Sequence, residues 1–339
     1  MIKKTYSHSG EFKLESGQIL NDIEICYHIS ENSINRSKPV VWICHALTAN
    51  SDAEDWWPGL VGKGKLFDPE KYTLICANIL GSCYGTTGAL STNPASGKQW
   101  LNDFPLVTVR DWANAHEVLR QHLKIKKIHL VAGGSIGGFQ SVEWAIMYPE
   151  RFENMMLVAT SYMQTPWAAA INETKRMCID ADSTFFNGSP DGGKAGLAAA
   201  RSVGLLSYRG YDAYNITQSE EDNEQGNSFK AASYQRYQGK KLVDRFNAHC
   251  YHAITRSQDT HNVARKRGSL KEALNVVKAK TLCVAISTDM LFPPVEQQLL
   301  SKYIPNAVYK QIESDFGHDG FLIESKKLAA IISKFLKKQ

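Results

Sequence analysis

The sequence predicts an α/β protein with a mostly parallel β-sheet, helices on both faces of the sheet and an inserted helical cap. Three observations predict it: short apolar runs recur along the chain, helical spacing separates some of them, and a long polar stretch interrupts the alternation. The 339 residues are many for one compact core but normal for an α/β domain with an insertion. We expect residues 1–165 and 281–339 to form the core and residues 166–280 to form the cap.

Two β-rich segments open the chain, at residues 11–14 and 23–29. Gly17, Asn21 and Asp22 lie between these segments and are typical turn residues. We therefore expect two strands separated by these three residues.

Near-continuous apolar runs follow, and a loop or a helical stretch bounds each one. Because they lack polar alternation, such runs are typical of parallel strands that are buried on both faces. The predicted strands are residues 40–44, 73–77, 128–132, 155–159, 281–286 and 308–312. Helical spacing predicts helices over residues 112–123, 139–148 and 325–336.

The alternation stops between residues 166 and 280. This stretch is polar, with a loop-like run at residues 187–193 and another polar run at residues 218–227. It shows helical patterns but no clear buried strand. We interpret it as a helical cap inserted between two strands of the sheet.

Composition excludes several classes of protein. Hydrophobic residues make up 43% and charged residues 22%, so the chain can bury a sizeable core. The net charge of +5 is spread thinly, and we interpret the short basic cluster at residues 265–267 as solvated surface, with weak steering of anions as an alternative. Nothing resembles a nucleic-acid-binding module, so no nucleic-acid partner is expected.

Cysteine usage and hydropathy predict the compartment. The seven cysteines form no CxxC pair and several lie in apolar runs, which favours free buried thiols in a reducing environment. The first residues lack the apolar core of a signal peptide, and no apolar run approaches the roughly 18 residues of a membrane helix. We expect a soluble, cytoplasmic protein with no membrane partner.

The strongest local motif is Gly-x-Ser-x-Gly at residues 133–137, centred on Ser135. A predicted strand precedes it and a predicted helix follows it. Small residues beside the serine allow a sharp strand-to-helix turn that projects the hydroxyl, as in the nucleophile elbow of the α/β-hydrolase fold. Taken alone, the motif also fits a phosphate-binding loop or a tight turn.

A serine nucleophile needs a base, and in this fold the order along the chain is Ser, Asp or Glu, His. Asp289 follows the predicted strand 281–286, and His318 lies in a glycine-flanked loop before the last helix. Both positions suit a catalytic triad with Ser135. Taken alone, Asp289 also fits a turn or a helix cap, and a lone histidine is by default a surface or core residue.

Two backbone N–H groups are candidates for an oxyanion hole. One is that of Ile136, at the start of the helix after Ser135, and the other is that of Leu47, in the loop after the strand 40–44. His45 belongs to the early strand, so we interpret it as structural.

Other groups of residues give weaker evidence of a functional site. His249 and His252 have helical spacing, but no third ligand is evident, so no metal site is predicted. Trp56 and Trp57 could line a pocket or pack in the core. Neither a Rossmann fingerprint nor a P-loop is present, and we expect no permanently bound cofactor.

Over nearly its whole length the chain resembles the homoserine O-acetyltransferase family. The resemblance rests on short segments in both the core and the cap. They are residues 44–48, 56–57, 76–85, 93–98, 103–105, 108–111, 133–138, 206–210 and 237–246.

The resemblance implies a ping-pong transfer from acetyl-CoA, as co-substrate, to the hydroxyl of L-homoserine, a step of methionine biosynthesis. Ser135 would carry the acetyl group, and His318, oriented by Asp289, would act as the base. Arg201 and Tyr208 from the cap and Asp319 after the histidine would bind the amino acid. Arginine can grip a carboxylate and aspartate can hold an ammonium. The resemblance also implies a homodimer paired through cap helices.

Departures from the family pattern leave the donor and the acceptor open. Ile136 stands where the family commonly has Met or Phe, and residues 88–90 and 247–252 also differ. Succinyl in place of acetyl, and L-serine in place of homoserine, are alternatives. A serine esterase or deacetylase would use the same triad with water as acceptor, whereas the complete set of three residues disfavours a non-catalytic binding protein.

Overall fold

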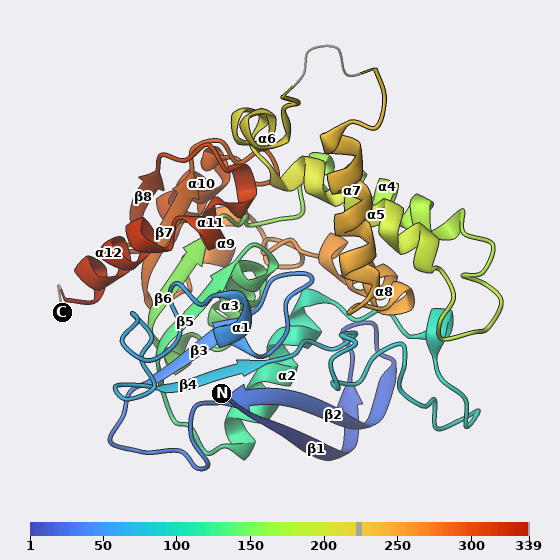
Figure 1. Ribbon diagram of the computed structural model, residues 1–339. Coiled ribbons are helices and arrows are strands. Elements are labelled where there is room, and N and C mark those ends of the chain that lie inside the picture. Colours follow the sequence, from blue (N-terminus) through green and yellow to red (C-terminus); the bar gives the residue numbers. More distant parts are fainter. Residues whose placement is uncertain (222–225, 338–339) are drawn as a thin grey trace.

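The computed structural model describes residues 1–221 and 226–337. A single eight-stranded sheet runs through the core in the order β1-β2-β4-β3-β5-β6-β7-β8 (Figure 1). Its pairs from β3 onward are parallel, and only β1 with β2 and β2 with β4 are antiparallel, which confirms the predicted mostly parallel sheet. The strands are β1 (Ile2–Lys13), β2 (Ile19–Ile29), β3 (Val40–Cys44), β4 (Thr73–Ala77), β5 (Ile128–Gly134), β6 (Phe152–Val158), β7 (Lys280–Ile286) and β8 (Val308–Ile312).

Helices cover both faces of the sheet. Core helices are α1 (Ala53–Trp56), α2 (Val109–His122), α3 (Ile136–Met147), α9 (Leu270–Leu274), α10 (Pro294–Tyr303), α11 (Gly320–Ile323) and α12 (Ser325–Leu336). Short 3₁₀ turns are η1 (Leu101–Asp103), η2 (Pro149–Arg151) and η3 (Gly317–Asp319). In β3, Trp42 belongs to the hydrophobic cluster that includes α2 and α3, and Ile43 to the opposite cluster with α12. Burial on both faces explains why the strands are continuously apolar.

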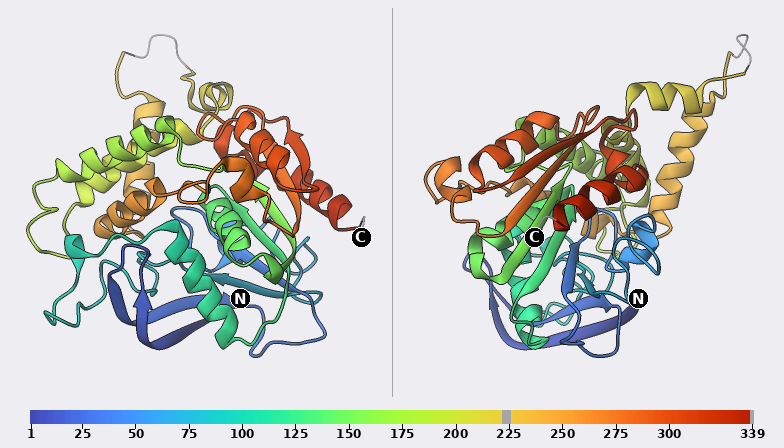
Figure 2. Two further views of the ribbon diagram at one scale, coloured as in Figure 1. Left: turned by 180° about the vertical axis from the view of Figure 1, so that it is seen from behind. Right: turned by 90° about the vertical axis from the view of Figure 1, so that its left-hand side faces the viewer.

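The segment between β6 and β7 is helical, as its pattern predicts. It holds α4 (Pro166–Asp180), α5 (Lys194–Tyr208), α6 (Tyr211–Gln218), α7 (Lys230–Val243), α8 (Ala248–Asp259) and α9. Helices α6 and α7 stand out from the rest of the molecule (Figure 2). Within the polar run 218–227, residues 222–225 lie outside the described residues. The boundaries of the cap at residues 166 and 280 stay a prediction.

The first hairpin differs from the expectation. β1 begins at Ile2, and Asn21 and Asp22 lie inside β2, so they do not form the turn. The sequence did not predict the part of β1 at residues 2–10, because a polar edge strand lacks an apolar run. The register shifts after His8, and there the Gly10 N–H donates to Asp22 Oδ1 at 2.8 Å. A β-bulge therefore accommodates Asp22, whose φ is 54°.

The other strand predictions are confirmed, with small shifts at their ends. β5 extends two residues beyond the prediction, and Ala159 lies just past β6 with a φ of 47°. All seven cysteines are free, with Cys83 and Cys178 only partly buried. None of the helices in the described part of the chain is both long and apolar enough to cross a membrane.

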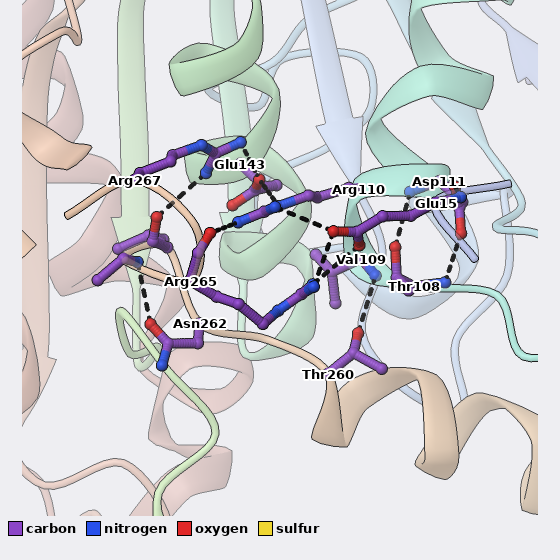
Figure 3. Close-up of polar contacts among 12 residues, drawn as sticks. Glu15, Thr108, Val109, Arg110, Asp111, Glu143, Thr260, Asn262, Arg265 and Arg267 are labelled. Carbon is purple, nitrogen blue, oxygen red and sulfur yellow. Dashed lines mark hydrogen bonds and ion pairs between the residues drawn. The ribbon is translucent and has the colours of Figure 1, made fainter. Parts of the chain in front are cut away.

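A network of charged side chains joins the first hairpin to the end of the cap segment (Figure 3). Glu15, in the β1–β2 turn, accepts hydrogen bonds from Arg110 Nη1 at 3.0 Å and from Arg265 Nη1 and Nη2 at 2.7 and 2.8 Å. Glu143 on α3 pairs with Arg110 and Arg267. The expectation of a solvated basic cluster is therefore wrong for Arg265 and Arg267, because both side chains fold back onto these carboxylates.

We expect Glu15→Gln to destabilise the fold. Burial opposes ionisation of Glu15, but the Arg265 hydrogen bonds and the nearby Arg110 charge outweigh it and lower the pKa to about 2. A carboxyl with a lowered pKa stabilises the fold above its unfolded-state pKa and loses this contribution as the pH falls through the folded-state value. Urea unfolding at pH 7 should show a loss of about 1–2 kcal/mol, since solvent partly screens the network.

This loss should shrink as the pH falls below the ordinary carboxyl pKa of 4.5. Glu70→Gln is the matched control, because Glu70 pairs with Lys63 on the exposed surface. Equal losses for the two variants, or a loss that grows toward acid, would contradict a stabilising network.

Candidate active site

Ser135 lies at a strained turn between β5 and α3. Its backbone angles are φ 57° and ψ −128°, outside the regions that non-glycine residues favour. Its N–H donates to Val158 O at 3.1 Å, and its carbonyl accepts from Gly138 N at 2.9 Å and Thr160 Oγ1 at 2.7 Å. Such strain costs of order 1–3 kcal/mol and persists only where neighbours over-determine it.

The flanking glycines are required by close backbone approach. A Cβ on Gly133 would lie 2.1 Å from Gly137 O, and a Cβ on Gly137 would lie 2.1 Å from Cys44 O. A Cβ on Gly138 would come within 2.4 Å of Thr160 Oγ1. The motif thus lets α3 start directly against the ends of β3 and β6.

The structure brings Ser135, His318 and Asp289 together in one hydrogen-bond chain. His318 Nε2 lies 2.9 Å from Ser135 Oγ, and His318 Nδ1 lies 2.7 Å from Asp289 Oδ2. Asp289 Oδ1 accepts the N–H groups of Leu291 and Phe292 at 2.8 and 2.9 Å. Asp289 therefore caps a turn and also partners the histidine. An ionised carboxylate accepts only, so this network assigns the proton to Nδ1 and leaves Nε2 to accept from the serine.

Aromatic rings enclose the His318 imidazole. Ring centroids of Phe292 and Phe321 lie 5.5 Å away, and that of Tyr208 lies 5.8 Å away. The side chains of Ser135, Asp289 and His318 are buried. The hydrogen-bond chain is thus largely shielded from water, which strengthens its electrostatic interactions.

A cleft of about 490 Å³ opens above Ser135. Leu47, in the loop after β3, lines it. Ile136 is the first residue of α3, where a helix leaves the backbone N–H without an intrahelical acceptor. Leu47 therefore lines the same cleft as Ser135, and Ile136 directly follows the serine.

His45 has a structural environment, as expected. Its Nδ1 donates to Ala46 O at 2.8 Å, and its Nε2 accepts the Ile79 N–H at 3.2 Å. Burial lowers the pKa of the imidazole to about 4, which keeps it neutral. Both ring nitrogens are occupied by backbone groups, so the ring has no proton to exchange with a substrate.

The three predicted substrate-binding residues line the same cleft. Arg201 and Tyr208 come from α5, and the Arg201 guanidinium carbon lies 5.8 Å from the Tyr208 ring centroid. Asp319 follows His318, and its Oδ2 lies 3.3 Å from Arg209 Nε. Burial raises the pKa of the Asp319 carboxyl, and the Arg209 charge opposes this effect.

Sequence reasoning missed two cations beside this group. Arg209 lies in the family-like segment 206–210, but the sequence does not show that Asp319 is its partner. Lys175 on α4 is buried, and its Nζ donates to Tyr208 Oη at 3.2 Å and to Asn172 Oδ1 at 3.3 Å. No sequence signal distinguishes Lys175 from a surface lysine, because its burial depends on how α4 packs against α5.

The cleft carries more positive than negative charge. Its lining includes the cations Arg201, Arg209, Lys241 and Arg245 and the acids Asp55 and Asp319. Such an excess favours anionic ligands.

The histidines and tryptophans that gave weaker sequence evidence have different surroundings in the structure. His249 binds Asn102 and the Ser189 carbonyl, and His252 faces Asp180. Among the described residues, no cluster of three possible metal ligands occurs. Trp56 lines the cleft, whereas Trp57 is fully buried in the core.

Comparison with known proteins places this chain in a family. Residues 39–325 match the family model of the alpha/beta hydrolase fold, which confirms the predicted fold class. A homoserine O-acetyltransferase of Cyclobacterium marinum is 43% identical over 336 residues, which cover 99% of this chain and 95% of that relative. A relative of the same name from Chlorobium chlorochromatii is 39% identical over 98% of this chain and 95% of its own length.

Solved structures share the fold. The homoserine O-acetyltransferase from Bacillus anthracis superposes with a TM-score of 0.89 at 23% identity, covering 99% of this chain and 97% of that one. Esterase E22 superposes equally well, with a TM-score of 0.89 at 24% identity and 99% coverage of both chains. At this identity the two likenesses show the fold and do not distinguish a transferase from an esterase.

Proposed function

The chain belongs to the homoserine O-acetyltransferase family, and we propose that it transfers an acetyl group from acetyl-CoA to the hydroxyl of L-homoserine. The observation that carries the proposal is the buried Ser135–His318–Asp289 hydrogen-bond chain at the floor of a cleft lined by cap residues. Sequence identity with acyltransferases over nearly the full length supports transfer over hydrolysis. This activity would serve methionine biosynthesis, and the free thiols support a reducing, cytoplasmic location.

In the proposed first half-reaction Ser135 takes the acetyl group. Its Oγ attacks the thioester carbonyl carbon while His318 Nε2 accepts the hydroxyl proton. The N–H groups of Leu47 and Ile136 would stabilise the resulting oxyanion. Collapse of this intermediate breaks the C–S bond, and His318 returns the proton to the leaving thiolate. The cationic cleft supports binding of a polyanionic donor such as CoA.

In the proposed second half-reaction His318 Nε2 accepts the homoserine hydroxyl proton while that oxygen attacks the acetyl-serine carbonyl. Collapse of this intermediate breaks the ester bond to Ser135 Oγ, and His318 returns the proton to Ser135 Oγ. Arg201 would bind the α-carboxylate and Asp319 the α-ammonium. The Arg209 partner of Asp319 refines this proposal, since an incoming ammonium would share the Asp319 carboxylate with Arg209. The hydrogen bond from Lys175 Nζ to Tyr208 Oη would fix the orientation of the Tyr208 ring.

We propose a homodimer formed through the projecting helices of the cap. Tyr211 and Ile216 on α6 and Tyr237 on α7 are exposed apolar or aromatic side chains on this projection. Large apolar groups that stay exposed in a monomer are typical of interaction surfaces when they form a patch.

The acyl-enzyme intermediate tests the proposed function. Incubation with acetyl-CoA alone should add one acetyl group to the intact mass of the wild type and none to Ser135→Ala, because a two-step transfer needs a serine ester. Ser135→Ala should also lower kcat by at least about 10³-fold with an unchanged circular dichroism spectrum. Thiol release that needs homoserine supports transfer, whereas equal release without an acceptor indicates an esterase. Succinyl-CoA and L-serine test the other donor and acceptor.

Arg201→Ala tests acceptor binding. It should impair transfer from the acetyl-enzyme to homoserine by roughly 10–100-fold while sparing acetylation of Ser135, because only the second step uses the α-carboxylate. Single-turnover measurements separate the two steps. Lys194→Ala is the matched control, since Lys194 is an exposed cation of the same helix. Equal damage to both steps would show that Arg201 does not hold the acceptor.

Ile216→Asp tests the homodimer. A charge on this exposed α6 residue should convert a dimer into a monomer in analytical ultracentrifugation, because burying an unpaired carboxylate is costly. Val295→Asp, on the exposed side of α10, should leave the mass unchanged. A wild-type monomer, or a dimer that survives the Ile216 change, would reject this interface.

A further inference from the structure

We propose that Thr160 and Gln140 are positioning residues that aim the two N–H groups of the oxyanion hole. This inference rests on the proposed function only in taking Leu47 and Ile136 as the oxyanion donors. Neither residue contacts the substrate in this proposal. Thr160 bonds to the carbonyl of the peptide that carries the Ile136 N–H, and Gln140 bonds to the carbonyls of the peptides next to those of the two donors, His45 O and Ile136 O.

Peptide planarity connects a held carbonyl to an aimed N–H. The C=O and N–H of one trans peptide point in opposite directions in a rigid plane. The peptide that carries the Ile136 N–H also carries the Ser135 carbonyl. Thr160 Oγ1 donates to that carbonyl at 2.7 Å, with Gly138 N at 2.9 Å as a second donor. A rotation that misaims the Ile136 N–H would break both bonds.

The backbone around Thr160 brings its hydroxyl to this carbonyl. Ala159, just before it, adopts a φ of 47°, and its N–H donates to Val284 O at 3.0 Å. The Thr160 carbonyl accepts from Gln297 Nε2. Thr160 is fully buried, so its hydroxyl has no bulk water with which to exchange this bond. Hydrogen bonds at the Ala159 N–H and at the Thr160 carbonyl thus hold the strained conformation of Ala159.

Gln140 spans the two halves of the hole. Its Nε2 donates to Ile136 O at 3.1 Å and to His45 O at 3.0 Å, which uses both of its amide protons. Its Oε1 lies 3.0 Å from His116 Nε2, and burial lowers the pKa of His116 to about 4. A neutral His116 that donates from Nε2 therefore fixes which way the amide faces.

The loop of Leu47 is held in the same manner. The peptide that carries the Leu47 N–H carries the Ala46 carbonyl, which accepts from His45 Nδ1 at 2.8 Å. Gln140 holds the preceding carbonyl, that of His45 itself. The two N–H groups come from segments about ninety residues apart in sequence, and Gln140 is the side chain that bonds to both segments.

The test replaces the Thr160 hydroxyl with a methyl group. Thr160→Val should lower kcat for acylation of Ser135 by p-nitrophenyl acetate roughly 10–100-fold, somewhat less than loss of an entire oxyanion donor. KM and the midpoint of the pH profile should not change, because the substrate pocket and His318 are untouched. Thr160→Ser, which keeps the hydroxyl, should restore the rate.

The control is Thr281→Val, which removes a buried threonine hydroxyl bonded to Ala279 O at the opposite end of the sheet. It should match Thr160→Val in thermal stability but keep wild-type kcat. Gln140→Met provides a second variant of similar volume, with the same expected fall in kcat at constant KM. Unchanged kcat in Thr160→Val and Gln140→Met, or an equal fall in the Thr281 control, would overturn the proposal.

The ester substrate keeps this result separate from the proposed function. Acylation by p-nitrophenyl acetate needs the serine, its base and the oxyanion hole, but neither CoA nor homoserine. If the wild type failed to acetylate homoserine yet reacted with the ester, the comparison of Thr160 variants would still decide the role of Thr160.

Discussion

The site depends on one constraint, the strained turn that carries Ser135 between β5 and α3. A serine in this conformation projects its hydroxyl into the cleft only if the helix begins at once against the neighbouring strands. Gly133 and Gly137 allow that approach because a Cβ on either would overlap backbone atoms. Bonds from Val158 and Thr160 then hold both backbone groups of Ser135. The local sequence permits the turn, and β6 fixes it.

The cap segment adds charge to a core that is otherwise apolar. Arg201 from the middle of α5 and Arg209 just after its end line the cleft, and Lys175 on α4 donates to Tyr208. Burying a lysine amine is costly unless polar groups surround it, and here they are a phenol and an amide. Helices inserted between two strands of an α/β-hydrolase core thus place charged side chains along the cleft.

Two histidines in this fold show how similar residues acquire different roles. His318 retains one nitrogen for Ser135 because Asp289 occupies the other. Both nitrogens of His45 bind backbone groups, so the ring can only shape the loop that carries Leu47. Hydrogen-bond partners, rather than distance from the serine, separate the proposed base from the structural residue.

The sequence by itself determined the parallel strands and the turn at Ser135, because apolar runs and a glycine motif are local signals. It also pointed to Asp289 and His318, which the structure joins to Ser135 in one hydrogen-bond chain. It could not show that Asp289 also caps a turn, that Arg209 pairs with Asp319, or that Lys175 is buried. It grouped Asn21 and Asp22 with Gly17 as turn residues, whereas both lie inside β2, where Asp22 stands opposite a bulge in β1. Only the tertiary structure decided these points, since each depends on groups that packing brings together from distant parts of the chain.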